Sequence, residues 1–337
     1  MQKAFITGVA GTSLTGDERR LIRQARPAGL ILFSRNLETA DQIRGLIADF
    51  KAEAGPSVLV LIDQEGGRVQ RLRPPLASAL PPAAAYAAHA HGDIGRAAAA
   101  AYAVARLLAD DLAALGIDTN CAPVLDVPVP GAHDIIGNRS FAADGATVIA
   151  VGRAFAEGLM AGGILPVMKH IPGHGRALAD SHLELPVVTA SRAELAQSDL
   201  VPFRALSDLP AAMTAHVVFP AIDAALPATT SKHVVEELIR GYCGFDGLLI
   251  SDDLGMKALT QPFAERAKAT IAAGVDLVLH CSGDFAEMCE VADAVPLLEG
   301  RGRERFEAAL AIGRAMPRAY DAAAARDVLH RLVARSA

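Results

Sequence analysis

The chain contains no tryptophan, and aromatic residues make up only 4% of its 337 residues. Hydrophobic residues nevertheless account for 52% of the sequence, so a large buried core is feasible and must be mostly aliphatic. Alanine-rich helices packed on strands of valine, leucine and isoleucine fit this composition. The length is sufficient for one large domain or two ordinary ones.

Cysteine is also scarce, with four residues at Cys121, Cys243, Cys281 and Cys289. None of them forms a CxxC pair, and their spacing matches no common zinc pattern. We therefore expect reduced, mostly buried thiols. This usage is typical of a reducing compartment.

Long charged tracts and long apolar runs are absent as well. The net charge is −6, and no basic tract indicates nucleic acid or an anionic membrane as a partner. No apolar stretch long enough to span a membrane is free of charge, proline or glycine. The N-terminal apolar run reaches charged residues by Asp17, which is too early for a signal peptide. We expect a cytoplasmic protein that binds neither nucleic acid nor membrane.

Short aliphatic runs alternate with longer helix-forming segments. We expect eight strands, at Ala4–Val9, Gly29–Phe33, Val58–Ile62, Asp118–Ala122, Leu165–Met168, Ala211–Ala215, Gly247–Ile250 and Val275–Leu279. We expect helices between them, including Asp17–Arg26, Ala40–Ala52, Arg96–Leu115, Ala146–Ala161, Ser231–Arg240 and Pro262–Ala273. Continuous apolar strands that alternate with helices favour a parallel sheet covered on both faces.

Eight such strands predict an α/β protein with a (β/α)₈ TIM-type barrel, in which the first strands can be irregular. No shift in composition marks a linker, so we expect residues 1–337 to form a single domain. The segment from about residue 301 to residue 337 is expected to form extra helices packed on the outside of the barrel.

Polar side chains follow four of the predicted strands. They are Asp63-Gln64-Glu65 after the third, Lys169-His170 after the fifth, His216 after the sixth and Ser251-Asp252-Asp253 after the seventh. Because barrel enzymes place their active sites at the C-terminal ends of the strands, this pattern predicts a site there.

Asp252 directly follows a predicted strand. A carboxylate at that position can serve as a nucleophile, an electrostatic stabiliser or a metal ligand. Its neighbour Asp253 should point to the other face of the strand, since side chains alternate. A cap on the following helix is the alternative role for Asp253.

Asp180 and His182 are two residues apart. In an extended segment both side chains would project to the same side, and the Asp180 carboxylate would orient the imidazole and raise its basicity. Histidine titrates near neutral pH and therefore suits alternating acid and base roles. An ordinary loop pair is the alternative, but the preceding segment Lys169–Gly175, rich in ionisable groups and glycine, favours the functional interpretation.

His170 and His174 are four apart, a spacing that on a helix would make a metal-binding pair. Pro172-Gly173 lies between them and argues against a helix. The glutamate expected of a metalloprotease helix is also missing, so we expect no metal.

The remaining candidates are basic and acidic groups at the predicted barrel mouth. Lys169 is expected either to donate to substrate oxygens or to form a structural salt bridge. Asp63 can accept hydrogen bonds from sugar hydroxyls. Arg71 and Arg139 lie near carboxylates in the sequence, and their setting at the predicted mouth makes them candidate site residues. A solvated ion-pair network is the alternative for both.

Six segments resemble family 3 glycoside hydrolases, and within them the single-domain bacterial β-N-acetylglucosaminidases. These segments are Asp63–Arg71, Gly137–Phe141, Lys169–Gly175, Asp180–His182, Met213–His216 and Ser251–Met256. The matches run in order from about Gly8 to Leu279. One departure is Ile171, where the family often has phenylalanine, and this apolar exchange should affect loop packing more than chemistry.

The resemblance implies a (β/α)₈ barrel that hydrolyses glycosides with retention of configuration. It implies that Asp252 is the nucleophile and that His182, oriented by Asp180, is the general acid and base on a mobile loop. Sugar-binding roles carry over to Asp63, Arg71, Arg139, Lys169 and His170. No cofactor and no metal are implied.

The implied substrate is a carbohydrate with terminal, non-reducing β-linked N-acetylglucosamine, especially muropeptide fragments that carry anhydro-N-acetylmuramic acid. The implied process is cell-wall recycling in the cytoplasm, and we expect a monomer. A β-N-acetylglucosaminide phosphorylase, a non-catalytic sugar-binding barrel and a metal-dependent hydrolase are the alternatives.

Overall fold

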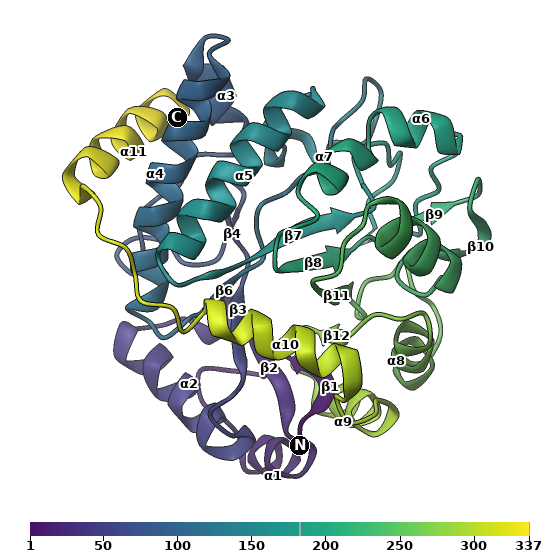
Figure 1. The fold of residues 1–337 in the computed structure, drawn as a ribbon. Coiled ribbons are helices and arrows are strands. Elements are labelled where there is room, and N and C mark those ends of the chain that lie inside the picture. Colours follow the sequence, from purple (N-terminus) through teal and green to yellow (C-terminus); the bar gives the residue numbers. More distant parts are fainter. Residues whose placement is uncertain (182, 337) are drawn as a thin grey trace.

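Eight parallel strands close into a barrel in the computed structural model, which describes residues 1–181 and 183–336 (Figure 1). Around the barrel the strands follow the order β1-β12-β11-β8-β7-β6-β3-β2, and each neighbouring pair is parallel. The barrel strands are β1 (Lys3–Thr7), β2 (Pro27–Leu32), β3 (Leu59–Ile62), β6 (Thr119–Asn120), β7 (Leu165–Ile171), β8 (Ala211–Thr214), β11 (Leu248–Asp253) and β12 (Leu277–His280). The predicted (β/α)₈ TIM-type barrel is confirmed.

Each predicted strand overlaps one barrel strand, but two strands run further than predicted. β7 continues to Ile171 because Lys169 and Ile171 still pair with Met213 and Thr214 of β8. β11 continues to Asp253, which pairs with β12. The polar residues that were expected after these strands therefore lie within their last residues. The first strands are irregular as expected, with a shift in register between β1 and β2.

Eleven α-helices and three shorter or irregular helices surround the barrel in the described part of the chain. The α-helices are α1 (Gly16–Ala25), α2 (Ala40–Ala54), α3 (Ala84–Ala90), α4 (Ile94–Ala113), α5 (Gly145–Ala161), α6 (Arg192–Gln197), α7 (Leu200–Ala205), α8 (Phe263–Ala272), α9 (Phe285–Ala294), α10 (Gly300–Ile312) and α11 (Ala322–Ser336). Two 3₁₀-helices, η1 (Ser34–Asn36) and η2 (Gly137–Arg139), and one π-helix, η3 (Val234–Tyr242), complete the set. The helix predicted over Ser231–Arg240 is therefore present, but as a π-helix.

Side-chain caps explain where several helices begin. Thr15 accepts a hydrogen bond from the Glu18 backbone, and Glu18 in turn accepts one from the Thr15 backbone, so α1 starts with a capping box. Asp93 and Asp144 cap α4 and α5 in the simpler way, with one carboxylate oxygen on a backbone N–H three residues ahead.

Two small antiparallel hairpins extend the loops above the barrel. β4 (Gln64–Gly66) pairs with β5 (Val69–Gln70) after β3, and β9 (Val218–Phe219) pairs with β10 (Asp223–Pro227) after β8. The buried Gln64 side chain accepts from the backbone of Arg71 and Leu72 and donates to the Leu72 carbonyl. These bonds fix the position of the segment that follows β3.

α10 closes the N-terminal end of the barrel. Phe306, Ala309 and Leu310 of this helix join the apolar cluster inside the barrel, where the first residues of β7, β8, β11 and β12 also lie. Figure 1 shows α10 crossing the barrel opening, while α11 packs on α3 and α4. Both C-terminal helices pack on the barrel and its helices, and α10 does so across the barrel bottom, which its apolar face covers.

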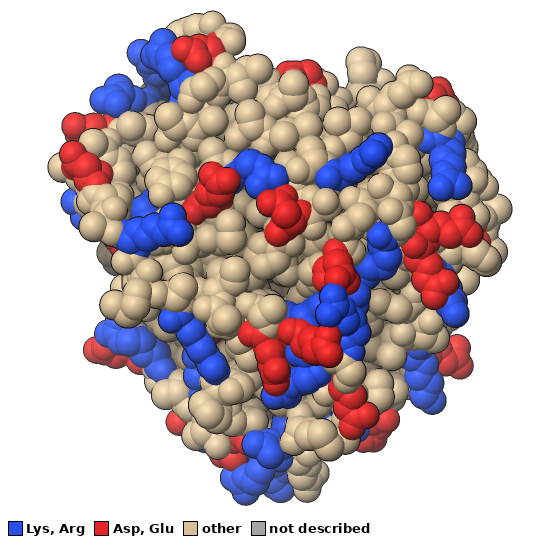
Figure 2. Space-filling model, in the orientation of Figure 1, with Lys and Arg blue, Asp and Glu red and all other residues tan. Residues whose placement is uncertain are grey.

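Acidic and basic side chains lie beside one another on the face drawn in Figure 2. Over α10, for example, Arg301 and Arg305 both pair with Asp246, and Arg305 also pairs with Asp276 at 3.0 Å. The four cysteines are free thiols, as expected, and three of them are buried. Within the described residues, none of the helices combines the length and apolar character needed to cross a membrane.

Candidate active site

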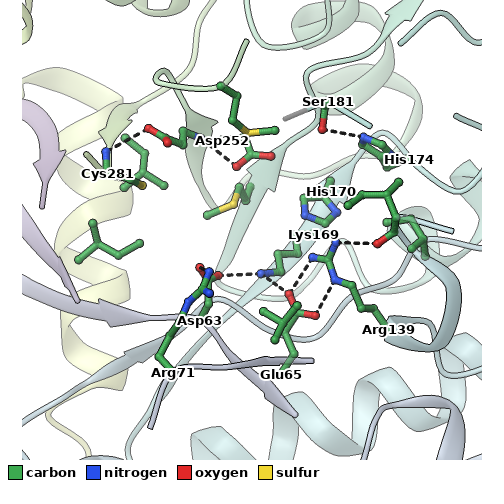
Figure 3. Close-up of a pocket in the computed structure, with 18 of the residues that line it drawn as sticks. Asp63, Glu65, Arg71, Arg139, Lys169, His170, His174, Ser181, Asp252 and Cys281 are labelled. Atoms are coloured by element: carbon green, nitrogen blue, oxygen red, sulfur yellow. Dashed lines mark hydrogen bonds and ion pairs between the residues drawn. The ribbon is translucent and has the colours of Figure 1, made fainter. Parts of the chain in front are cut away.

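A cavity of about 560 Å³ lies at the C-terminal ends of the barrel strands (Figure 3). Its polar lining contains six of the residues singled out in the sequence: Asp63, Arg71, Arg139, Lys169, His170 and Asp252. It also contains Glu65, Arg68, His174, Ser181, Asp253 and Cys281, and its apolar lining includes Ile31, Phe33, Met213, Met256 and Leu279. The fold thus gathers side chains that are up to 250 residues apart in the chain, from Ile31 to Cys281.

Five charged side chains form one cluster on a side of this cavity. Lys169 Nζ lies 2.9 Å from Asp63 Oδ1 and 2.6 Å from Glu65 Oε1. Arg139 binds Glu65 through two parallel bonds of 2.8 Å, and Arg71 lies 3.2 Å from Asp63. Bidentate arginine–carboxylate pairs of this kind fix orientation as well as charge. Of these five side chains only Arg71 is substantially exposed, so the alternative of a solvated ion-pair network does not describe Arg139.

The cluster keeps both of its carboxylates ionised. Burial acts to raise the pKa of Asp63, but Lys169 and Arg71 lower it well below its usual value. Burial likewise opposes ionisation of Glu65, but Lys169 and Arg139 lower its pKa to about 2. In turn, burial acts to lower the pKa of Lys169, yet the two carboxylates hold it above its usual value. All of these groups are charged near neutral pH.

His170 is oriented by a carboxylate that sequence reasoning missed. Its Nδ1 lies 2.7 Å from Asp126 Oδ2, and Asp126 is fully buried. The other Asp126 oxygen accepts from the backbone N–H groups of His170 and His174. Burial acts to raise the pKa of Asp126, but His170 lowers it below its usual value. The pair leaves Nε2 as the ring nitrogen of His170 that is not bonded to Asp126.

His174 lies next to His170 but has no metal-like arrangement with it. The two rings meet edge to face, with centroids 5.8 Å apart. His174 Nε2 lies 3.1 Å from Ser181 Oγ, whereas its Nδ1 is buried without a partner. Burial, together with the neighbouring His170, lowers the pKa of His174 to about 4, so this ring is neutral near neutral pH. Among the residues that the structure describes, no three His, Cys, Asp or Glu side chains are grouped to hold a metal ion.

Asp252 occupies the penultimate position of β11. Its Oδ1 accepts from the Asp253 backbone N–H at 2.8 Å, and its own backbone N–H donates to Thr214 Oγ1 at 3.3 Å. Burial acts to raise the pKa of Asp252, but His216, His170 and Lys169 lower it below its usual value. Figure 3 shows the carboxylate on the opposite side of the cavity from the charged cluster.

Asp253 points away from Asp252, as the alternation of side chains predicts. Its Oδ1 accepts from the backbone N–H groups of Gly255 at 2.9 Å and Cys281 at 3.0 Å. Burial, with the nearby Asp252 charge as a further contribution, raises its pKa. The alternative that Asp253 caps a helix is wrong, because the next helix begins only at Phe263.

The segment between β7 and α6 carries the remaining predicted residues. Ser181 lines the cavity, and Asp180 is half-buried with its backbone carbonyl accepting from Leu183 and Glu184. Asp180 is not among the described residues that line the cavity. His182 lies outside the described residues.

Gly175 explains part of the glycine pattern in this segment. A Cβ at this position would lie 2.0 Å from the Val127 carbonyl oxygen, so only glycine permits this close contact between two backbone segments. The contact places the segment after β7 against the one after β6, which carries Asp126.

Sequence reasoning missed Glu65, Asp126 and the position of Ser181. Glu65 lay inside the quoted Asp63–Arg71 segment, and its spacing of two from Asp63 was the available signal. No comparable signal was available for Asp126, because it lies in an irregular segment six residues after the two-residue strand β6. In this cavity the Asp252 carboxylate faces a cluster of charged hydrogen-bonding groups. This arrangement suits a polar ligand with several hydroxyl groups.

Comparison with known proteins gives a consistent result. The chain matches the family described as glycosyl hydrolase family 3 N terminal domain over residues 7–311. It is 42% identical over 282 residues to a protein named beta-hexosaminidase from Alkalilimnicola ehrlichii, which covers 82% of this chain and 80% of that protein.

Two crystal structures from Neisseria gonorrhoeae are also similar. Native NagZ matches with a TM-score of 0.86 at 34% identity, and the match covers 98% of each chain. NagZ in complex with N-trifluoroacetyl-D-glucosamine matches with a TM-score of 0.85 at 34% identity and the same coverage.

Proposed function

The chain belongs to glycosyl hydrolase family 3 and is a glycosidase, and we propose that it is a retaining exo-β-N-acetylglucosaminidase with Asp252 as nucleophile. The observation that carries this proposal is the half-buried Asp252 carboxylate, which faces the cavity from the end of β11. The names of its relatives supply the sugar: they are beta-hexosaminidases, and one was crystallised with an N-acylated glucosamine.

In the first step, an Asp252 oxygen attacks the anomeric carbon while the bond to the leaving group breaks. This gives a covalent glycosyl-enzyme, and water then displaces Asp252 with overall retention of configuration. The lowered pKa of Asp252 supports this role, because the nucleophile must be ionised at the start. The Asp253 N–H holds one carboxylate oxygen, which leaves the other to attack.

A proton donor must serve the departing sugar oxygen, and a base must then activate water. Most retaining glycosidases use a second carboxyl group for both tasks. We propose that His182 replaces it and that Asp180 orients His182. This assignment rests on the family resemblance and is supported by Ser181, the residue before His182, which lines the cavity.

The charged cluster is proposed to bind the sugar. Asp63 and Glu65 can accept from hydroxyl groups, while Lys169, Arg71 and Arg139 can donate to them. Since each group is already held by an opposite charge, little reorganisation is needed when the sugar enters. His170, held by Asp126, adds a further oriented polar group.

Phosphorolysis is the alternative reaction at the same site. In the described part of the cavity, three cations, Lys169, Arg71 and Arg139, share the two carboxylates of Asp63 and Glu65. The names of the relatives favour hydrolysis. Product analysis with and without phosphate separates the two reactions, because only phosphorolysis yields a sugar 1-phosphate.

The finer biological assignment rests on the family resemblance alone. We propose that the substrates are muropeptides of the N-acetylglucosaminyl-anhydro-N-acetylmuramic acid type, and that the reaction serves cell-wall recycling in the cytoplasm by a monomeric enzyme. Turnover of such a muropeptide by the purified protein, and its mass in solution, test this assignment.

Trapping the intermediate tests the central proposal. A fluorinated N-acetylglucosamine analogue with a good leaving group should inactivate the enzyme, and peptide mapping should find the label on Asp252. The Asp252→Ala variant should fold and still bind N-acetylglucosamine, but should lose turnover of an aryl N-acetylglucosaminide. Labelling of another residue, or near-normal turnover by this variant, would refute the nucleophile assignment.

A further inference from the structure

We propose that Thr214, Thr229 and His216 are positioning residues that hold Asp252 in place through a closed chain of buried hydrogen bonds. This inference rests on the proposed function, in which Asp252 is the nucleophile. The three residues come from the end of β8 and from the segments that follow it, and all three are fully buried.

The chain of hydrogen bonds begins where the backbone pairing of β8 with β11 ends. Backbone pairing between these strands runs from Leu248 with Ala211 to Ile250 with Met213. Beyond this pairing, the N–H of Asp252, two residues after Ile250, donates to the hydroxyl of Thr214, the residue after Met213, at 3.3 Å. The Thr214 side chain thus replaces the backbone of β8 as the hydrogen-bond partner of β11 at Asp252.

From Thr214 the hydrogen bonds return to the residue after Asp252. Thr214 Oγ1 lies 2.7 Å from Thr229 Oγ1, and Thr229 Oγ1 lies 2.7 Å from His216 Nδ1. His216 Nε2 then lies 2.9 Å from the Asp253 carbonyl oxygen. The chain thus binds Asp252 at its backbone N–H and Asp253 at its backbone carbonyl.

The carbonyl at one end places a hydrogen on His216. A carbonyl can only accept, so His216 Nε2 must carry a hydrogen. In the neutral ring, Nδ1 accepts from the Thr229 hydroxyl, which also lies 3.1 Å from the Ala215 carbonyl oxygen, a second acceptor for the same hydrogen. The Thr229 hydroxyl accepts from the Thr214 hydroxyl, and the Thr214 hydroxyl accepts from the Asp252 N–H. None of the polar side-chain atoms of Thr214, Thr229 and His216 is buried without a partner.

The geometry explains how this chain acts on the carboxylate. Asp252 Oδ1 is held by the Asp253 N–H, and His216 binds the carbonyl of the same residue, on the other side of its Cα. The hydrogen bond from His216 therefore restrains the residue that holds the carboxylate. None of the three supporting residues lines the cavity, so they cannot contact a bound sugar and must act through Asp252. Misplacement of a reacting group by about 1 Å can cost about 10²-fold in rate.

A matched pair of variants at Thr229 tests the proposal. Thr229→Val keeps the side-chain volume but removes the hydroxyl, so it breaks the chain in the middle. Thr229→Ser keeps the hydroxyl but removes a methyl group. We expect Thr229→Val to lower kcat for an aryl N-acetylglucosaminide by about 10- to 100-fold with KM within about threefold, and Thr229→Ser to retain kcat within about threefold.

The pair separates positioning from packing. If Thr229 served only to fill space, the serine variant would be the more impaired of the two, because it creates the larger void. A similar loss of kcat in Thr229→Ser and Thr229→Val, or a normal kcat in Thr229→Val, would overturn the proposal. Should Thr229→Val fail to fold by circular dichroism, Thr214→Val and Thr214→Ser make the same comparison at the other hydroxyl.

The failure of this inference differs from failure of the proposed function. Absence of hydrolysis by the wild-type protein, or full activity of Asp252→Ala, would remove the proposed function. An active wild-type enzyme with an inactive Asp252→Ala variant and an unaffected Thr229→Val variant would leave that function intact and remove only the positioning role.

Discussion

At the scale of single residues, the site is built from charges that are already paired. Lys169 was expected either to meet substrate oxygens or to form a structural salt bridge, and its geometry suits both roles. It lies between Asp63 and Glu65, yet it also lines the cavity. Because an isolated buried ion is costly, such pairing is what permits three cations to line one cavity.

The proposed acid role of His182 leads to a prediction that depends on the leaving group. A poor leaving group needs protonation as its bond breaks, whereas an activated aryl group leaves without it. His182→Ala should therefore lose about 10²- to 10⁴-fold in kcat/KM on a disaccharide substrate, but much less on a nitrophenyl or dinitrophenyl glycoside. Steady-state kinetics on both substrates check this.

Two controls make the result specific. Asp252→Ala should lose activity on both substrates alike, since attack is needed whatever the leaving group. Equal losses for His182→Ala on the disaccharide and on the activated glycoside would remove its acid role.

At the scale of elements, loops are held over the barrel by close backbone contacts as well as by side chains. Gly175 approaches Val127 so closely that any side chain would overlap a carbonyl oxygen. The Val129 N–H also donates to the Gly175 carbonyl at 3.3 Å. The segment that leads to Asp180 is thereby tied to the segment that follows Asp126.

The Gly175→Ala variant should consequently separate these two segments. We expect kcat/KM to fall at least about 10-fold, because both His170 and the segment toward His182 depend on this contact, and the melting temperature to fall by several degrees. Kinetics and a thermal melt measure the two effects.

Gly45→Ala in α2 is the matched control. A Cβ there meets no atom within 4 Å, and alanine favours a helix interior over glycine by roughly 0.5–1 kcal/mol. This variant should keep full activity and be slightly more stable. An active, stable Gly175→Ala variant would show that the contact with Val127 can relax at no cost.

The sequence predicted the elements better than their ends. Nearly continuous apolar runs marked most of the barrel strands, because burial on both faces leaves a strong signal, whereas β6 consists of Thr119 and Asn120. The extension of β7 through Lys169 and His170 carries no such signal, since polar residues at a strand end look like a loop. The same ambiguity hid Asp126, whose role depends on the position of His170 in three dimensions rather than on spacing.

The position of α10 was beyond sequence reasoning for a different reason. Its apolar residues predict a helix with one buried face, but they do not say what that face covers. The apolar N-terminal end of the barrel, which Phe306 and Leu310 cover, exists only once the eight strands have come together. An outer helix and a helix that seals the barrel have the same pattern.

At the scale of the whole molecule, the buried carboxylates link stability to pH. The pKa of Glu65 is lowered from 4.5 to about 2 on folding, and those of Asp63 and Asp126 are lowered as well. At these three groups the folded state therefore binds fewer protons than the unfolded state in this range. The resulting stabilisation is fully present above pH 5 and is lost as the pH falls toward 2.

Glu65→Gln tests this dependence. The variant should be less stable than the wild type at neutral pH, because Arg139 and Lys169 lose a charged partner. Its free energy of unfolding should decline less steeply in acid, because about one proton fewer is taken up on unfolding. Urea unfolding at a series of pH values between 7 and 3 measures both quantities. An acid decline as steep as that of the wild type would mean that Glu65 does not contribute.

The seal formed by α10 bears on how a ligand reaches the cavity. The barrel interior is packed with side chains, and Phe306 and Leu310 cover its N-terminal end. No path therefore leads along the barrel axis to the cavity, which lies at the opposite ends of the strands. Under the proposed function, both products of cleavage must leave on the side from which the substrate entered.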